Sequence, residues 1–183
     1  AHLLPPAADA CGRVEVVDLG LPVPGDAAVL AVRPAEADLG RLLRVPGSTD
    51  HKYTRGVVGL WTGSRAYPGA AVLAASAAVR SGAGMVRLSA PQRVEDLVLA
   101  RRPEVVLAPG RCQARVIGPG IDPADVVRGA ELDAVLAEAL DGRGDPAPTA
   151  SPASPASRSP QPAVIDAGAL PMLAERLRTG ARC

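Results

Sequence analysis

Residues 51–91, HKYTRGVVGLWTGSRAYPGAAVLAASAAVRSGAGMVRLSAP, decide the fold of this chain. Within them, Val57–Trp61 is a short apolar run beside glycine, which predicts a strand buried on both faces. Residues 63–69 are rich in Gly, Ser and Pro and predict a tight turn. Residues 70–83 are mostly alanine, which favours a helix lying close against a sheet, and a second strand follows. The stretch therefore predicts one compact strand, turn, helix and strand unit.

The junction between this strand and its helix is a candidate ligand site. Pro68 and Gly69 stand where the helix should begin, a position at which proline costs no hydrogen bond. Because the first N–H groups of a helix are unpaired, a helix that starts at the carboxyl end of a buried strand can bind an anion or a nucleotide. The same spacing fits an ordinary strand-to-helix turn equally well. Neither the Lys-Ser/Thr pair of a Walker loop nor a GxGxxG motif is present.

The composition points to a domain of helices on a parallel sheet. The chain has 183 residues and is 48% hydrophobic, which is enough for one domain with a substantial core. Phe is absent and aromatic residues make up only 2% of the chain. The core must therefore be built from Ala, Val and Leu, which suits closely packed layers of helix and parallel sheet.

Charge and cysteine content exclude several classes of protein. Lys and Arg number 20 against 19 Asp and Glu, so a net charge of +1 gives no electrostatic case for nucleic-acid binding. No apolar run approaches the roughly 18 to 20 residues of a membrane span, and no signal pattern opens the chain. Cys11, Cys112 and Cys183 lack zinc-site or disulfide-framework spacing. We expect a soluble, cytoplasmic protein with reduced thiols and without a metal site, a membrane or a nucleic-acid partner.

Further elements follow along the chain. Two more strands are predicted at Ala114–Ile117 and Ala163–Ile165, and helices at residues 95–100, 130–140 and 170–177, with a short strand or loop at 105–107. Gly118-Pro119-Gly120 follows the first of these strands and would place backbone without side chains at the edge of the sheet, where a ligand could approach. Taken alone, this tripeptide is better explained as a plain tight turn.

Several motifs in a fixed order carry a resemblance to a known family. They are His51-Lys52 with Gly56, GS-x-x-YPGA at 63–70, RSGAG at 80–84, VIGPG at 116–120 and VIDAGAL at 164–170. Together they resemble the opening of the NAD(P)H-hydrate dehydratases, which are ribokinase-like enzymes that repair damaged nicotinamide cofactors. The resemblance implies an α/β fold with a mostly parallel sheet and helices on both faces, here incomplete because the carboxyl-terminal part is absent.

The resemblance also implies a division of the chain. Residues 1–24, with a strand and turn at 12–22, look like the tail of an NAD(P)H-hydrate epimerase domain, although an ordinary first strand of the same domain is the alternative. Residues 25–50 contain several prolines and read as a linker. Residues 51–183 are then the N-terminal part of the dehydratase domain. Residues 142–162 are a Pro, Ala and Ser insertion that we expect to be disordered or extended.

The chemistry implied by the resemblance is a phosphorylation followed by an elimination. The hydroxyl of the S-form of hydrated NADH or NADPH is phosphorylated by ADP or ATP with Mg²⁺, and loss of phosphate restores the ring double bond. The family's GGxGD motif supplies the base and the anion hole, and an HPGE-type segment precedes it. Neither motif occurs in this sequence. We therefore assign no catalytic residue, and we expect the chain as given to be inactive and only marginally stable.

Because the catalytic motifs are missing, the resemblance predicts residues only for the part of the site that binds the acceptor. Ala70, Gly118 and Gly120 are the residues expected to contact the hydrated cofactor. His51 and Lys52 match the family but receive no chemical role. The family commonly reads DADALN where this chain reads DAGALP, so Gly168 and Pro171 put any polar contact through those two positions in doubt. Asp166 matches and stays a candidate for a polar contact.

Two other functions remain open from the sequence. One is a different ribokinase-like small-molecule kinase, such as a kinase of a vitamin precursor, although the segment from PGA to GAG argues against it. The other is a non-catalytic binding or scaffolding role that uses residues 142–162. In the favoured interpretation the full-length enzyme is a homo-oligomer, a lyase that in many bacteria is fused to the epimerase in one multifunctional polypeptide.

Overall fold

The structure is a computed structural model of the whole chain. It describes residues 7–12, 15, 17, 19–20, 22, 38–40, 43, 45–108, 110–122, 124–140 and 161–179. The chain divides into two compact units, Ala1–Arg44 and Val45–Cys183. In the first unit the described residues include one short helix, α1 (Ala7–Cys11). The predicted strand within residues 12–22 lies largely outside the described residues, and the six described there belong to no helix or strand.

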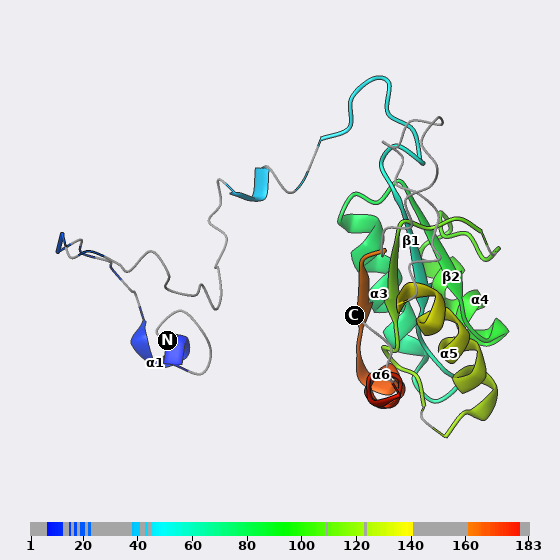
Figure 1. Ribbon diagram of the computed structural model, residues 1–183. Coiled ribbons are helices and arrows are strands. Elements are labelled where there is room, and N and C mark those ends of the chain that lie inside the picture. The colour runs from blue at the N-terminus through cyan, green and yellow to red at the C-terminus, as the bar shows by residue number, and fades with distance from the viewer. Residues whose placement is uncertain are drawn as a thin grey trace, which may run out of the picture. The chain divides into compact units, whose positions relative to one another are not determined.

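The second unit is built on a parallel sheet with the strand order β2-β1-β3-β4 (Figure 1). The strands are β1 (Val57–Trp61), β2 (Met85–Ser89), β3 (Ala114–Ile117) and β4 (Ala163–Ile165). All three pairs of neighbours run parallel. Since β1 pairs on both sides, it is a central strand, as its continuous apolar sequence predicts. The predicted parallel sheet is confirmed.

One face of the sheet is covered by α3 (Pro68–Arg80) and α4 (Gln92–Arg101). Their buried Ala71, Ala75 and Val94 pack against Leu60 and Leu88 of the strands. Ala71 and Ala75 are completely buried, and their methyl groups let the helix lie close to the sheet. The helix α3 begins at Pro68, where the sequence analysis placed the helix start, and ends three residues before the predicted end at residue 83.

The other face is covered by α5 (Val126–Leu140) and α6 (Leu170–Arg178), which follows a single 3₁₀ turn, η1 (Ala167–Ala169). Ile117, Leu132 and Ala169 are fully buried there. Arg176 ties the two helices together, because its Nη2 donates to Asp133 Oδ2 over 2.7 Å. Helices therefore lie on both faces of the sheet, as the sequence analysis expected.

The short segment predicted at residues 105–107 behaves as a rudimentary strand. Val106 pairs with Arg87 on the outer side of β2, donating to Val86 O over 2.9 Å and accepting from Leu88 N over 3.0 Å. The connection through α4 therefore leads to the far side of β2, and the chain must then return to β3 on the other side of β1. On its return it passes the buried Cys112, which contacts the face of β1 at Gly59.

A buried arginine holds together residues that lie on either side of segment 141–160. The Arg115 guanidinium is 7% exposed, donates to Gln161 Oε1 over 2.8 Å and lies 3.5 Å from Glu138 Oε2. It also lies 6.0 Å from the ring centroid of Trp61. These contacts fix Gln161, two residues before β4, against β3 and α5. The predicted disorder of the insertion at 142–162 falls almost wholly on residues outside the described ranges.

Substitution of a buried leucine of α5 tests how this helix packs against the sheet. Leu132 is fully buried in the α5 face of the core, whereas Leu73 of α3 is 73% exposed. We expect Leu132→Ala to lower the free energy of unfolding by about 2–5 kcal/mol, because it leaves a cavity. Leu73→Ala should change it by no more than about 0.5 kcal/mol. Urea unfolding of both variants measures the difference, and equal losses would contradict the assigned core.

Candidate acceptor site

Two of the three predicted site residues touch one another at the carboxyl end of the sheet. Gly120 has φ +68°, and a Cβ placed on it would overlap the Ala70 methyl group and lie 2.9 Å from Tyr67 O. Ala70 is in the first turn of α3, and Gly120 follows β3. Gly63 N also donates to Pro119 O over 2.8 Å, which joins the turn after β1 to the turn after β3. The turns that carry Ala70 and Gly120 are therefore in direct contact.

Gly118, the third predicted residue, packs beneath the end of β4. Its φ is +113°, a conformation that favours glycine. A Cβ there would overlap Asp166 O and lie 2.7 Å from the Ala169 Cβ. Its N–H donates to Trp61 O over 3.0 Å, so the backbone is already used in the sheet. Close chain packing thus requires glycine at both positions, and any ligand contact made there would use backbone groups.

The start of α3 offers hydrogen-bond donors at this edge. Tyr67 occupies the N-cap without a side-chain capping bond, while Ser64 Oγ accepts from Tyr67 N over 3.2 Å. The N–H groups of Gly69 and Ala70 therefore lie in a first turn that no side chain caps. Uncapped donors and the helix dipole both favour an anion. This arrangement agrees with the anion or nucleotide site that the spacing alone could only indicate.

A buried hydroxyl that the sequence analysis missed lies beside this turn. Thr62 follows β1 directly, is fully buried, and its Oγ1 has no hydrogen-bond partner among the described residues. An unsatisfied buried hydroxyl is costly, so positions like this need an explanation. The signal in the sequence was a hydroxyl residue between an apolar strand and a glycine turn, a pattern too common to single it out.

Asp166 lies at the end of β4 with its side chain exposed. Both backbone groups of Asp166 are hydrogen-bonded. Its N–H donates to Ile117 O over 3.0 Å, and its carbonyl accepts from Ala169 N over 3.1 Å. Gly168 faces the backbone of Ile121, whose O would lie 2.6 Å from an added Cβ. Gly168, where this chain differs from the family pattern, therefore lets the 3₁₀ turn lie close to the loop after β3. No contact assigns a chemical role to Asp166.

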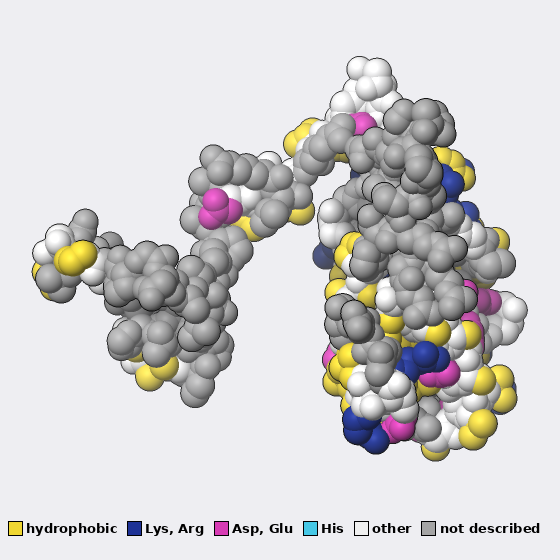
Figure 2. Space-filling model, in the orientation of Figure 1, with side chains coloured by type: hydrophobic (Ala, Val, Ile, Leu, Met, Phe, Trp, Pro, Cys, Tyr) yellow, Lys and Arg dark blue, Asp and Glu magenta, His cyan; other side chains and the backbone are white. Residues whose placement is uncertain are grey.

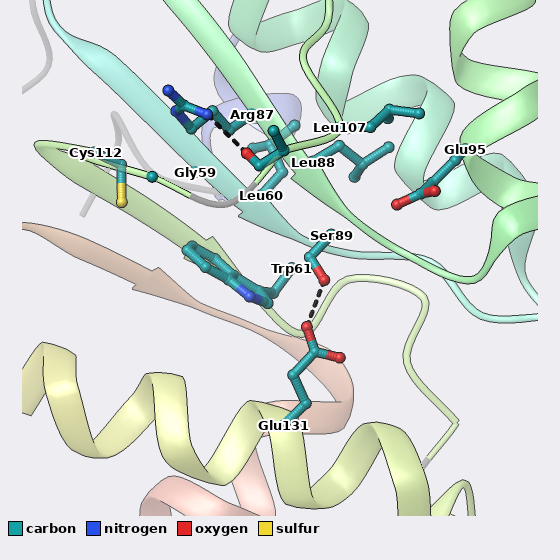
Figure 3. Close-up of a pocket in the computed structure, with 12 residues that line it drawn as sticks. Gly59, Leu60, Trp61, Arg87, Leu88, Ser89, Glu95, Leu107, Cys112 and Glu131 are labelled. Carbon is teal, nitrogen blue, oxygen red and sulfur yellow. Dashed lines mark hydrogen bonds between the residues drawn. The ribbon is translucent and has the colours of Figure 1, made fainter.

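A cavity of about 290 Å³ opens beside the carboxyl halves of β1 and β2 (Figure 3). None of the three predicted site residues lines it. The lining residues are Gly59, Leu60, Trp61, Arg87, Leu88, Ser89, Glu95, Leu107, Ala108, Gly110, Cys112 and Glu131. Figure 3 shows the Ser89 hydroxyl directed at the Glu131 carboxylate, with the Trp61 indole beside them. The sequence analysis missed this hollow because its walls come from segments far apart in the chain.

One wall of the cavity is fixed by the buried Arg128 of α5. Its guanidinium donates to Ser89 O over 2.8 Å and to Glu131 Oε2 over 2.5 Å. Opposite charges and a backbone carbonyl thus hold α5 over the carboxyl end of β2. On another wall, Arg87 Nη1 donates to Ala108 O over 2.7 Å. These contacts use the guanidinium groups of Arg87 and Arg128 to hold the walls of the cavity together.

No metal-binding cluster is found among the described residues, since no three His, Cys, Asp or Glu side chains gather there. Within the same ranges, none of the helices has both the length and the apolar character needed to cross a bilayer. On the face drawn in Figure 2, the basic side chains in the lower part of the second unit lie next to acidic ones.

Comparison with known proteins identifies relatives over most of the second unit. A family model described as NAD(P)H-hydrate dehydratase matches residues 58–182. The bifunctional NAD(P)H-hydrate repair enzyme of Mycobacterium tuberculosis is 48% identical over 117 residues, which are 61% of this chain and 24% of that enzyme. The chain thus spans about a quarter of the length of this curated relative.

Solved structures agree with this comparison. The ADP/ATP-dependent NAD(P)H-hydrate dehydratase of Bacillus subtilis, co-crystallised with ATP and Mg²⁺, superposes with a TM-score of 0.50 and 25% identity, covering 71% of this chain and 43% of that one. A ribokinase-like superfamily protein of Enterococcus faecalis gives 0.51 and 25%, covering 57% and 40%. The fold is therefore ribokinase-like. With the family model matched across residues 58–182, the chain belongs to the NAD(P)H-hydrate dehydratase family.

Proposed function

We propose that this chain supplies the acceptor-binding part of an ADP- or ATP-dependent NAD(P)H-hydrate dehydratase. Its substrate is the S-form of hydrated NADH or NADPH, and the product is the restored cofactor. The observation that carries the proposal is the contact of Gly120 with Ala70 below the uncapped first turn of α3. Both turns stand at the carboxyl end of parallel strands, where ligands of open α/β sheets bind.

The chain's own contribution to the reaction is binding and orientation. N–H groups at the start of α3 can bind an anionic group of the substrate, and the glycine turn lets the ligand approach the backbone closely. In the proposed reaction a phosphoryl group passes from the nucleotide to the ring hydroxyl. The C–O bond then breaks and a ring proton is lost, which releases phosphate and restores the double bond. We assign the base to no described residue, because the GGxGD motif that supplies it in the family does not occur in this sequence.

The nucleotide and the metal ion are assigned to no residue of this chain. ADP or ATP with Mg²⁺ is proposed as the phosphoryl donor because the Bacillus subtilis relative is ADP/ATP-dependent and was co-crystallised with ATP and Mg²⁺. The described residues do not fit a metal site, since they gather no cluster of carboxylates, His or Cys. No step is therefore derived through a metal held here.

The wider setting of the proposed enzyme follows from its relatives. The Mycobacterium tuberculosis relative is bifunctional. We accordingly propose that residues 1–24 are the tail of an epimerase domain, that 25–50 are a linker, and that 51–183 begin the dehydratase domain with an insertion at 142–162. The whole enzyme would be a cytoplasmic homo-oligomer that acts on a small molecule.

Binding of the hydrated cofactor tests the acceptor site. A carboxylate at Ala70 should favour the helix start yet compete for its N–H groups and repel a phosphate-bearing ligand. We expect Ala70→Asp to weaken the affinity for NADPH hydrate at least tenfold, measured by isothermal titration calorimetry. Ala77→Asp, at an exposed position on the same helix, is the matched control and should bind like the unsubstituted chain. Equal affinity in both variants, or no binding to the unsubstituted chain, would refute the assignment.

A turnover measurement tests whether this chain binds the substrate without catalysing the reaction. We expect the chain alone to dehydrate no NADPH hydrate in the presence of ADP or ATP and Mg²⁺, because the family's GGxGD motif, which supplies the base, does not occur in this sequence. The measurement is recovery of the absorbance of reduced nicotinamide, with a full-length relative as the positive control. A measurable rate would show that the chain carries the catalytic groups after all.

A further inference from the structure

Two arginines and a tyrosine line a second hollow in the described part of the chain. This hollow has a volume of about 280 Å³, and its described lining residues are Tyr53, Arg87 and Arg111. Tyr53 precedes β1, Arg87 is the middle residue of β2, and Arg111 lies in the segment before β3. The fold therefore brings together two cationic side chains that are far apart in the sequence. We call this place the arginine hollow.

The Arg87 guanidinium is held in place by the loop that returns to β3. Its Nη1 donates to Ala108 O over 2.7 Å. A Cβ placed on Gly110 would lie 2.8 Å from the Arg87 Cζ, so glycine at this position lets the loop lie directly against the guanidinium. An arginine whose side chain is already positioned loses little conformational entropy when it binds an anion.

The surroundings of the arginine hollow are basic. Lys52 Nζ lies 5.1 Å from the ring centroid of Tyr53. Asp50, the acidic residue of the same segment, accepts from Gly47 N over 2.7 Å and from Thr54 Oγ1 over 3.2 Å, so its carboxylate is engaged within its own turn. No carboxylate is among the described residues that line the hollow. Because guanidinium groups pair well with phosphate and carboxylate groups, the hollow favours an anion.

Arg87 also lines the cavity of about 290 Å³ beside β1 and β2, so this side chain is a wall common to the cavity and the arginine hollow. Figure 3 shows Arg87 on one side of the Trp61 ring and Glu131 on the other. The Glu131 carboxylate is paired with Arg128 and hydrogen-bonded to the Ser89 hydroxyl. The acidic side of the cavity is thus neutralised by Arg128, whereas its Arg87 side is cationic.

We propose that the arginine hollow and the adjoining cavity form a binding site for a small aromatic phosphate monoester. The phosphate pairs with Arg87 and Arg111 and accepts from the Tyr53 hydroxyl. A phosphate monoester offers more acceptor oxygens than a carboxylate, which suits a hollow with several donors. The aromatic ring enters the cavity beside Trp61, where there is room for it, since a cavity of about 150 Å³ holds benzene.

This site is distinct from the proposed acceptor site. None of Ala70, Gly118 and Gly120 lines either the arginine hollow or the cavity. Binding of a phosphate monoester here therefore does not depend on the proposed dehydratase reaction, and the two proposals can fail separately.

The fluorescence of Trp61 tests the site directly, because this residue is the only tryptophan of the chain. We expect phenyl phosphate to change the emission of the full chain saturably. Inorganic phosphate, measured by competition, should bind about tenfold more weakly because it buries no ring. Phenol should also bind about tenfold more weakly than phenyl phosphate, because it lacks the charged group that pairs with arginine.

Substitutions identify the groups that hold the phosphate. Arg111→Gln and Arg87→Gln should each weaken the affinity for phenyl phosphate about tenfold, because each removes a charged hydrogen-bond donor. Arg93→Gln, at an exposed position on α4, makes the same change in net charge and should bind like the unsubstituted chain. Arg111 is also exposed, so the far-UV circular dichroism of Arg111→Gln should be unchanged, and this variant decides if Arg87→Gln does not fold.

The outcomes separate this site from the alternatives. Absence of saturable binding, equal affinity for phenyl phosphate and either inorganic phosphate or phenol, or an equal loss in Arg93→Gln would overturn the proposal. Ala70→Asp should leave the affinity for phenyl phosphate unchanged, and a loss in that variant would place the ligand at the acceptor turns instead. Binding of phenyl phosphate by a chain that does not bind NADPH hydrate would support this site and refute the proposed function.

Discussion

Parallel pairing of β1 on both of its sides is the constraint on which the rest of the second unit depends. The strand bonds to β2 along its whole length and to β3 from Val58 to Trp61. Its backbone polar groups are thereby satisfied in a position where Val57 and Leu60 are each 1% exposed. Parallel neighbours also bring the carboxyl ends of the strands to one edge, which is why turns distant in the sequence meet there.

Small residues allow close packing at the edge of the sheet where the carboxyl ends of the strands meet. Ala71 and Ala75 let α3 lie against the sheet, and a Cβ on Gly63 would come within 2.8 Å of the Ala71 Cβ. Gly120 fits against Ala70 for the same reason. A core almost without aromatic residues is therefore suited to a site made of backbone groups, whose geometry depends on close approach rather than on large side chains.

Buried arginines perform a different task, since they hold the second helical layer in place. Arg128 links α5 to the end of β2, and Arg115 links α5 to Gln161, two residues before β4, and to Trp61. Each is paired with a carboxylate and with an uncharged oxygen, which offsets the cost of burying the charge. The Arg128 contacts bound the cavity beside β1 and β2, because their partners Ser89 and Glu131 line it.

The sequence by itself determined the strands of the sheet, the apolar faces of the helices and the family, because periodicity and ordered motifs are local properties of the chain. Through the resemblance it also named Ala70, Gly118 and Gly120 as residues expected to contact the ligand. Only the tertiary structure decided that Gly118 is needed for packing under Asp166, that Val106 pairs outside β2, and that Arg128 reaches Ser89. Those facts join residues far apart in the chain, and no local pattern encodes which side chains a folded sheet brings together.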